Sequence, residues 1–184
     1  LGATVTLSGI CGEDEPASQL RHAVEQSGVK WAVCPSATET IVKLRVLSRN
    51  QQLLRMDFEQ DLSAYADDLF TALVGAQLDA ADTVVFSDYA KGTLQQVASM
   101  IELAKERGKR VLVDPKGNDL ERYRGATLLT PNLSEFEAVV GPCDSEAQLL
   151  ERGEALRKQL ALEALLITRS ERGMTLIEAN KEPL

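Results

Sequence analysis

The strongest constraint on the fold is the alternation of short apolar runs with amphipathic stretches along most of the chain. Apolar runs at 83–87, 110–113 and 164–168 have the length and composition of buried strands. Between the first two, residues 94–104 carry apolar side chains at the spacing of one helical face. This alternation predicts an α/β fold with a mostly parallel sheet and helices on both of its faces.

The remaining segments continue the same pattern. A helix at 15–27 is supported by Pro16, which suits a first turn, and by Gly28, which suits a helix exit. A further helical face is expected through Leu62, Tyr65, Leu69 and Leu73. Other strands are expected at 4–10, 29–34, 126–129 and 174–177, and other helices at 135–140 and 146–160.

Residues 40–58 interrupt this pattern. Two segments, 40–46 and 53–58, alternate apolar with charged side chains, and 48–51 between them suit a turn. We therefore expect a hairpin that leaves the main sheet and has one apolar and one charged face. The apolar side chains are Val42, Leu44, Val46, Leu54, Met56 and Phe58, and the charged ones are Lys43, Arg45, Arg55 and Asp57.

Composition excludes several classes of protein. With 28 acidic and 20 basic side chains, the formal charge of −8 argues against binding to nucleic-acid backbones. No run approaches the ~18 apolar residues of a membrane span, and residues 1–20 do not resemble a signal peptide. Cys11, Cys34, Cys143 and the single His22 form neither a disulfide framework nor a zinc motif, so we expect a cytoplasmic protein.

Polar side chains follow four of the expected strands. Asp88 stands in S-D-Y-A-K-G, Asp114 in D-P-K-G, Asn132 in T-P-N-L-S-E, and Thr168 in T-R-S-E-R-G. Ligands of open α/β sheets bind beyond the carboxyl ends of the strands. The four exits together therefore predict a ligand site at one sheet edge.

The residue types at these exits suggest a phosphorylated ligand. Lys91 and Lys116, with an expected helix start at 91–93, would attract phosphate groups. Asn132 and Glu135 could hold a hydrated Mg²⁺ beside nucleotide phosphates, because Mg²⁺ loses its water reluctantly. The chain has neither a P-loop nor the G-x-G-x-x-G of dinucleotide sites.

Each of these features also has a purely structural explanation. Asn132 and Glu135 have the spacing of a helix capping box, which alone would account for both. Asp88 suits an Asx-turn or a cap, and residues 114–117 suit a simple turn. The charged face of the hairpin could be a solvated edge.

The exit motifs, in this order, resemble those of the ribokinase-like (phosphofructokinase B, or pfkB) carbohydrate kinases. Within that family, K-L-R-V-L-S-R-N-Q-Q-L-L-R-M-D and E-R-Y-R-G-A-T-L-L-T-P-N resemble the heptose 7-phosphate kinases, and the resemblance covers nearly the whole chain. It implies a ribokinase-like fold whose hairpin at 40–58 is a lid or clasp that pairs two copies in a homodimer. It also implies transfer of the γ-phosphoryl group of Mg·ATP to position 1 of D-glycero-β-D-manno-heptose 7-phosphate. That product serves the synthesis of ADP-heptose and of the lipopolysaccharide core.

The resemblance assigns roles to individual residues. Asp88, Lys91, Lys116 and Arg45 would contact the sugar or its phosphate, and Glu135 would face Mg²⁺ through water. The nucleotide-binding positions are Asn132, Leu133, Ser134, Glu135, Thr168, Ser170 and Gly173.

Two motifs of the family are absent from residues 1–184: an N-terminal glycine-rich sugar motif and a C-terminal G-A-G-D with the general-base aspartate. We therefore expect residues 1–184 to be the central part of one kinase domain, with the base beyond residue 184 and little activity on their own. Two alternatives stay open, a non-catalytic nucleotide-binding or dimerisation module and a kinase for another sugar.

Overall fold

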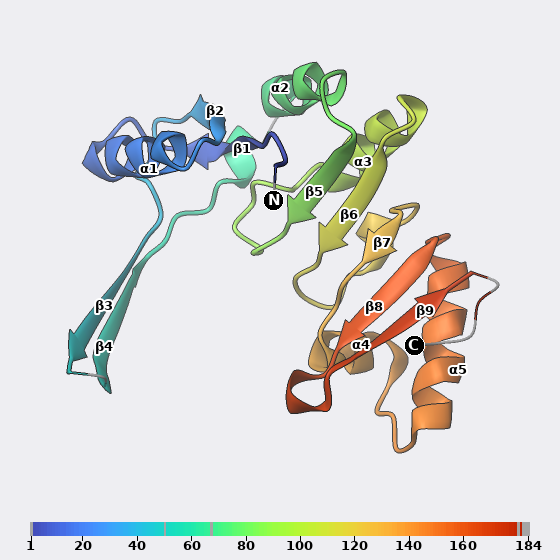
Figure 1. Ribbon diagram of the computed structural model, residues 1–184. Coiled ribbons are helices and arrows are strands. Elements are labelled where there is room, and N and C mark those ends of the chain that lie inside the picture. The colour runs from blue at the N-terminus through green and yellow to red at the C-terminus, as the bar shows by residue number, and fades with distance from the viewer. Residues whose placement is uncertain (1, 50, 67, 180, 182–184) are drawn as a thin grey trace. The chain divides into compact units, whose positions relative to one another are not determined.

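The structure is a computed structural model that describes residues 2–49, 51–66, 68–179 and 181 (Figure 1). The chain forms two compact units. The first comprises Leu1–Val74 and Lys91–Gln95, and the second comprises Gly75–Ala90 and Gln96–Leu184. Each unit is described separately below.

A five-stranded sheet forms the centre of the second unit (Figure 1). Its first four strands are parallel and lie in chain order, and the fifth is antiparallel to the fourth. This confirms the expected mainly parallel sheet. The strands are β5 (Thr83–Ser87), β6 (Arg110–Asp114), β7 (Leu128–Leu129), β8 (Ala164–Thr168) and β9 (Met174–Glu178).

Helices of the second unit cover one face of this sheet, whereas we expected them on both faces. The reason is topological: the parallel strands follow chain order, so right-handed crossovers place successive helices on the same side. Fully buried side chains on the covered face include Val113, Leu129 and Leu165, while Val85 on the opposite face is 64% exposed. The helical segments are α3 (Val97–Glu106), η2 (Glu121–Tyr123), α4 (Leu133–Val140), α5 (Glu146–Gln159) and η3 (Ser170–Arg172).

The first unit opens with a parallel pair of strands, β1 (Thr6–Cys11) and β2 (Lys30–Pro35), joined by α1 (Glu15–Gln26). The Asp14 carboxylate caps α1 by accepting a hydrogen bond of 2.9 Å from the Ala17 amide. Pro16 lies in the first turn as expected, and Gly28 leaves the helix with a φ of 76°.

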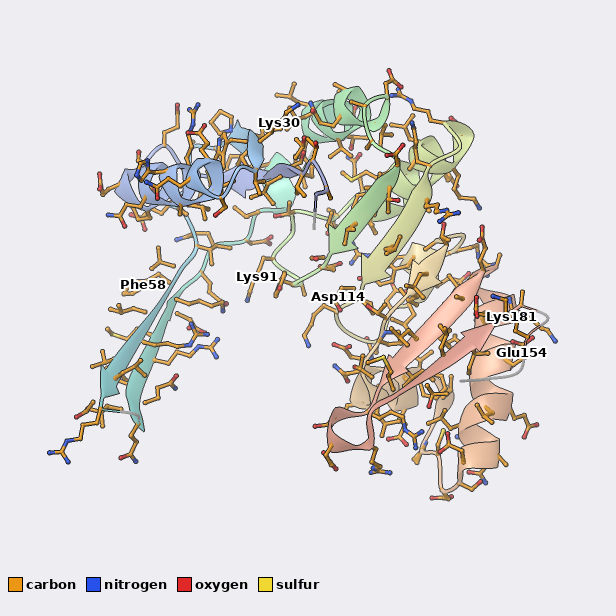
Figure 2. All side chains as sticks on the ribbon, in the orientation of Figure 1. Lys30, Phe58, Lys91, Asp114, Glu154 and Lys181 are labelled. Carbon is orange, nitrogen blue, oxygen red and sulfur yellow. The ribbon has the colours of Figure 1, made fainter. Side chains whose placement is uncertain are left out.

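The hairpin of the first unit confirms the alternation that predicted it. Strands β3 (Val42–Ser48) and β4 (Gln51–Phe58) pair antiparallel, with Leu44 opposite Met56 and Val46 opposite Leu54. A bulge follows Val46. Figure 2 shows side chains projecting from both sides of the hairpin, and its apolar face is exposed.

The helical face expected through Leu62, Tyr65, Leu69 and Leu73 is wrong. A short 3₁₀ turn, η1 (Ser63–Tyr65), comes first, and α2 (Asp68–Leu78) starts separately. The helical phase therefore restarts, and Leu69 is 67% exposed. The buried side chains of α2 instead stand four residues apart, at Phe70, Val74 and Leu78.

Candidate functional site

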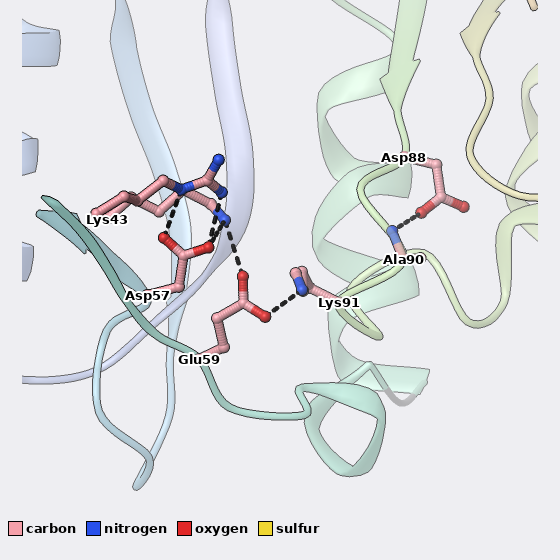
Figure 3. A network of polar contacts seen from close by, with 7 residues as sticks. Lys43, Asp57, Glu59, Asp88, Ala90 and Lys91 are labelled. Atoms are coloured by element: carbon pink, nitrogen blue, oxygen red, sulfur yellow. Dashed lines mark hydrogen bonds and ion pairs between the residues drawn. The ribbon is translucent and has the colours of Figure 1, made fainter. Parts of the chain in front are cut away.

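Asp88, at the exit of β5, is buried and its carboxylate is fully engaged. One oxygen, Oδ1, accepts a hydrogen bond of 2.7 Å from the Ala90 amide (Figure 3). The other, Oδ2, accepts a bond of 2.7 Å from the Tyr123 hydroxyl and lies 3.9 Å from Arg122 Nη1. The Asx-turn considered as an alternative is therefore present, and Asp88 is only 6% exposed.

Tyr123 is a residue of this site that the sequence did not single out. Its side chain is fully buried. Burial, and then its hydrogen bond to Asp88, raise the pKa of Tyr123 far above its ordinary value. The phenol therefore stays protonated at neutral pH and serves as a donor. A buried carboxylate requires such partners, and this requirement was the one signal that could have led to Tyr123.

Lys116, in the loop after β6, reaches the residue expected at the magnesium site. Its Nζ lies 2.9 Å from Glu135 Oε1, and the Lys116 side chain is half exposed. The hydrogen bond to Glu135 raises the pKa of Lys116. The exits of β6 and β7 therefore meet through one charge-assisted bond.

Asn132 and Glu135 form the capping box that their spacing predicted. Asn132 Oδ1 accepts from the Glu135 amide at 2.9 Å, and Glu135 Oε2 accepts from the Asn132 amide at 3.1 Å. The structural explanation is thus confirmed for both residues. Leu133 and Ser134 lie in the first turn of α4, with Leu133 half-buried and Ser134 exposed.

The turn after β8 lies beside this cap. Thr168 forms an isolated parallel bridge with Asn132, and its amide donates to the Pro131 carbonyl at 3.0 Å. The turn reverses through Ser170 and Gly173, which have positive φ values of 52° and 78° and are both exposed. The two expected nucleotide-binding motifs are therefore neighbours.

Arg169 is a second residue that sequence reasoning missed. Its guanidinium donates to both carboxylate oxygens of Glu146, at 2.8 and 2.7 Å, and to the Thr175 hydroxyl at 2.9 Å. Its amide donates to the Gly173 carbonyl at 2.8 Å. Arg169 therefore anchors the turn to α5 and β9.

The donor set around Glu135 suits a hydrated Mg²⁺ held largely by phosphate oxygens. Glu135 supplies one carboxylate, and its side chain is 12% exposed. Across the described ranges, no group of three or more His, Cys, Asp or Glu side chains could hold a metal ion. Mg²⁺ in kinases commonly uses one or two carboxylates together with substrate phosphates, so this sparse set fits.

Lys91 belongs to the first unit, within a network of ion pairs (Figure 3). The Glu59 carboxylate joins two lysines, accepting from Lys43 Nζ at 2.8 Å and from Lys91 Nζ. Lys43 Nζ also lies 3.5 Å from Asp57 Oδ2. Two ammonium groups therefore converge on one carboxylate.

The expected helix start at 91–93 is wrong, because α3 begins only at Val97. Gly92 instead packs against η1 with a φ of 93°, where a Cβ would lie 2.2 Å from the Ser63 amide nitrogen. Close packing, rather than helix initiation, explains this glycine.

Arg45 lies on the charged face of the hairpin, as predicted. It is exposed and stands directly across from Arg55, which forms a bidentate pair with Asp57 at 2.7 Å. Like charges directly opposite each other in a sheet repel, so a bound anion would stabilise this pair of arginines.

Comparison with known proteins agrees with this geometry. Residues 1–183 match the pfkB family carbohydrate kinases. The chain belongs to this family. It is 54% identical over 185 residues to the Bifunctional protein HldE of Chromohalobacter salexigens, and 53% identical over 185 residues to that of Proteus mirabilis. Each match covers the whole chain but 39% of the relative's length.

Solved structures of sugar kinases share the fold. Phosphofructokinase-2 from Escherichia coli in complex with fructose-6-phosphate gives a TM-score of 0.78 at 16% identity, over 100% of this chain and 62% of that one. Ribokinase of Arabidopsis thaliana complexed with ribose and ATP gives 0.71 at 16% identity, over 98% and 60%. The ribokinase-like fold is thereby confirmed. None of the helices in the described part of the chain has the length and apolar character to span a membrane.

Proposed function

We propose that this chain forms part of an ATP-dependent kinase that phosphorylates heptose 7-phosphate at position 1 of the sugar. The observation that carries the proposal is the bridge between Asn132 and Thr168, which brings the two expected nucleotide motifs together. The similarity over the whole of this chain to relatives named Bifunctional protein HldE supports the heptose substrate.

Each end of the nucleotide would have its own contacts. The exposed turn at Ser170 and Gly173 would face the nucleoside side, since Gly173 has no side chain to keep a ligand from its backbone. Lys116 would leave Glu135 for the transferred phosphate, and Glu135 would then be free to face the hydrated Mg²⁺. When bound, that ion would neutralise charge that develops on the phosphates.

The sugar phosphate would be recognised by cations of the first unit. Lys91 and Lys43 already share the Glu59 carboxylate, which a phosphate group could replace. Arg45 adds an exposed guanidinium, which suits a phosphate better than an ammonium does.

A homodimer through the hairpin clasp belongs to the same proposal. Exposed apolar side chains on one hairpin face suit a second copy of the chain, since such faces are costly in water. They are Leu44, Val46, Leu54, Met56 and Phe58. A cytoplasmic location is also proposed, in line with the free thiols of Cys11, Cys34 and Cys143.

The test is a chimera. This chain replaces the 185 matched residues of the Proteus mirabilis relative, and the chimera and the unmodified relative are assayed together with Mg·ATP and heptose 7-phosphate. Phosphorus NMR should show the 1,7-bisphosphate from the chimera. A folded chimera that binds ATP without forming product would favour the non-catalytic module, and a preference for another sugar would favour the other alternative.

A matched pair of variants tests the site itself. In the chimera, Lys116→Met should lower kcat/KM at least tenfold, because a charge that faces the phosphates is lost. Lys30→Met removes an exposed lysine of β2 and should leave kcat/KM unchanged. Equal rates for the two variants would contradict the role of Lys116.

A further inference from the structure

Tyr123 and Asp88 form a buried pair of a phenol and a carboxylate. The chemistry proposed above does not use this pair. Its hydrogen bond measures 2.7 Å, and both side chains lie almost entirely out of solvent. A buried carboxylate is costly unless several donors satisfy it. So costly an arrangement suggests a function beyond filling the core.

The pair ties together the loops that leave β5 and β6. The Asp88 amide donates to the Asp114 carbonyl at 2.9 Å, so the two exits are already joined through the backbone. The Asp88 carboxylate holds the Ala90 amide on one side and the Tyr123 hydroxyl on the other. The Lys116 amide in turn lies 3.5 Å from that hydroxyl oxygen, in weak hydrogen-bond reach.

The backbone of Lys116 is therefore held at its amide by the Tyr123 hydroxyl. Its long side chain spans the distance from there to Glu135. A lysine side chain is flexible, so the position of its ammonium group depends on where its backbone is held. Misplacement of a catalytic group by about 1 Å can lower the rate of the reaction about a hundredfold. A rigid loop under Lys116 would then matter as much as the lysine itself.

We infer that Tyr123, whose hydroxyl is held by the Asp88 carboxylate, is a positioning residue that fixes the loop carrying Lys116; the inference rests on the proposed kinase function. Asp88 thereby takes a role different from the direct substrate contact expected from sequence. Its carboxylate is held by the Ala90 amide, the Tyr123 hydroxyl and the nearby Arg122 guanidinium, and it acts from beneath the site.

The test removes one oxygen atom. Tyr123→Phe keeps the buried ring and deletes the hydroxyl, whereas Tyr89→Phe makes the same change at a tyrosine that is 69% exposed. In the chimera, Tyr123→Phe should lower kcat about tenfold or more, with the KM for heptose 7-phosphate nearly unchanged. Tyr89→Phe should leave both constants as they are.

Loss of stability alone is controlled by Leu156→Ala, which opens a cavity under α5, the helix that packs on β8 and β9. At a temperature where both variants are folded, Leu156→Ala should keep the wild-type kcat. If it lowers kcat as far as Tyr123→Phe does, or if Tyr123→Phe leaves kcat unchanged, the inference is wrong.

Hydrogen exchange on the 184-residue chain provides a readout that needs no activity. Tyr123→Phe should speed exchange at the Ala90 and Lys116 amides more than tenfold, and Tyr89→Phe should not. Should the chimera be inactive, the proposed kinase function fails, while unchanged exchange would independently overturn the positioning role of Tyr123.

Discussion

Asn132 and Thr168 face each other in an isolated parallel bridge, which joins the loop just past β7 to the last residue of β8. This bridge places the N-terminus of α4 beside the β8–β9 turn. The arrangement follows from the sheet, because neighbouring parallel strands deliver their exit loops to one edge. The expected nucleotide side of the site is thus built on two adjacent strands and on backbone geometry.

The capping role and the ligand role of Asn132 can be separated by substitution. Asn132→Ala should lower the free energy of unfolding by about 1 kcal/mol, because the Glu135 amide loses its acceptor. Asn132→Ser keeps a capping oxygen and should restore most of that stability. Urea unfolding of the three proteins measures both effects.

Nucleotide titration of the chimera then distinguishes the two roles. If Asn132 also contacts the nucleotide or its hydrated Mg²⁺, the stable Asn132→Ser variant should still bind Mg·ATP several-fold more weakly than the wild type. Unchanged affinity in Asn132→Ser would mean that Asn132 only caps the helix.

The parts of the fold that local patterns control were predictable. The strand at Thr83–Ser87 ends where the apolar run ends, and the hairpin follows its own alternation. The capping box was predictable because three-residue spacing places Asn132 and Glu135 on the same helical turn. These features depend on neighbours in sequence, which a sequence shows directly.

Features that depend on distant partners could not be predicted. The break between η1 and α2 shifts the buried face to Phe70, and no glycine or proline marks it. The sequence predicts a helix start at 91–93 because it does not reveal the contact of Gly92 with Ser63. Tyr123 and Asp88 are far apart in the chain, and only the paired strands bring them together.

Gly153 lies where α5 packs tightly against side chains of β8 and β9. A Cβ at this position would lie 2.3 Å from Ile177 Cδ1 and 3.6 Å from Ile167 Cδ1, both in the core. We expect Gly153→Ala to destabilise the chain by about 1–3 kcal/mol through overpacking, despite the better helix propensity of alanine. Gly9→Ala is the matched control, because a Cβ added there would meet no atom within 4 Å. It should not measurably lower the free energy of unfolding. Equal unfolding midpoints for the two variants would refute the tight packing.

The exposed hairpin face should control association. Leu54 is 50% exposed and lies opposite Val46 on the apolar face. Leu54→Asp places a charge there and should convert the proposed dimer to monomer in sedimentation equilibrium. Leu69→Asp, at a position 67% exposed on α2, is the control and should keep the wild-type mass. A dimer that survives Leu54→Asp would show that the copies meet elsewhere.

Acid should weaken the second unit through Glu154. Arg157 is buried and donates to both Glu154 oxygens, at 2.7 and 2.8 Å, and to the Leu162 carbonyl. Hydrogen bonding from Arg157 lowers the pKa of Glu154 from 4.5 to about 2. Because the folded pKa lies below the unfolded one, the pair stabilises the fold above pH 4.5, and this contribution is lost as the pH falls towards 2.

Melting temperatures of the wild type and Glu154→Gln, measured from pH 7 to pH 2, check this expectation. The wild type should melt higher at neutral pH, and the gap should narrow between about pH 5 and pH 2 as Glu154 becomes protonated. Glu151→Gln changes an exposed residue of the same helix and should follow the wild type throughout. A gap that stays constant to pH 2 would mean that Glu154 stabilises the helix by something other than its charge.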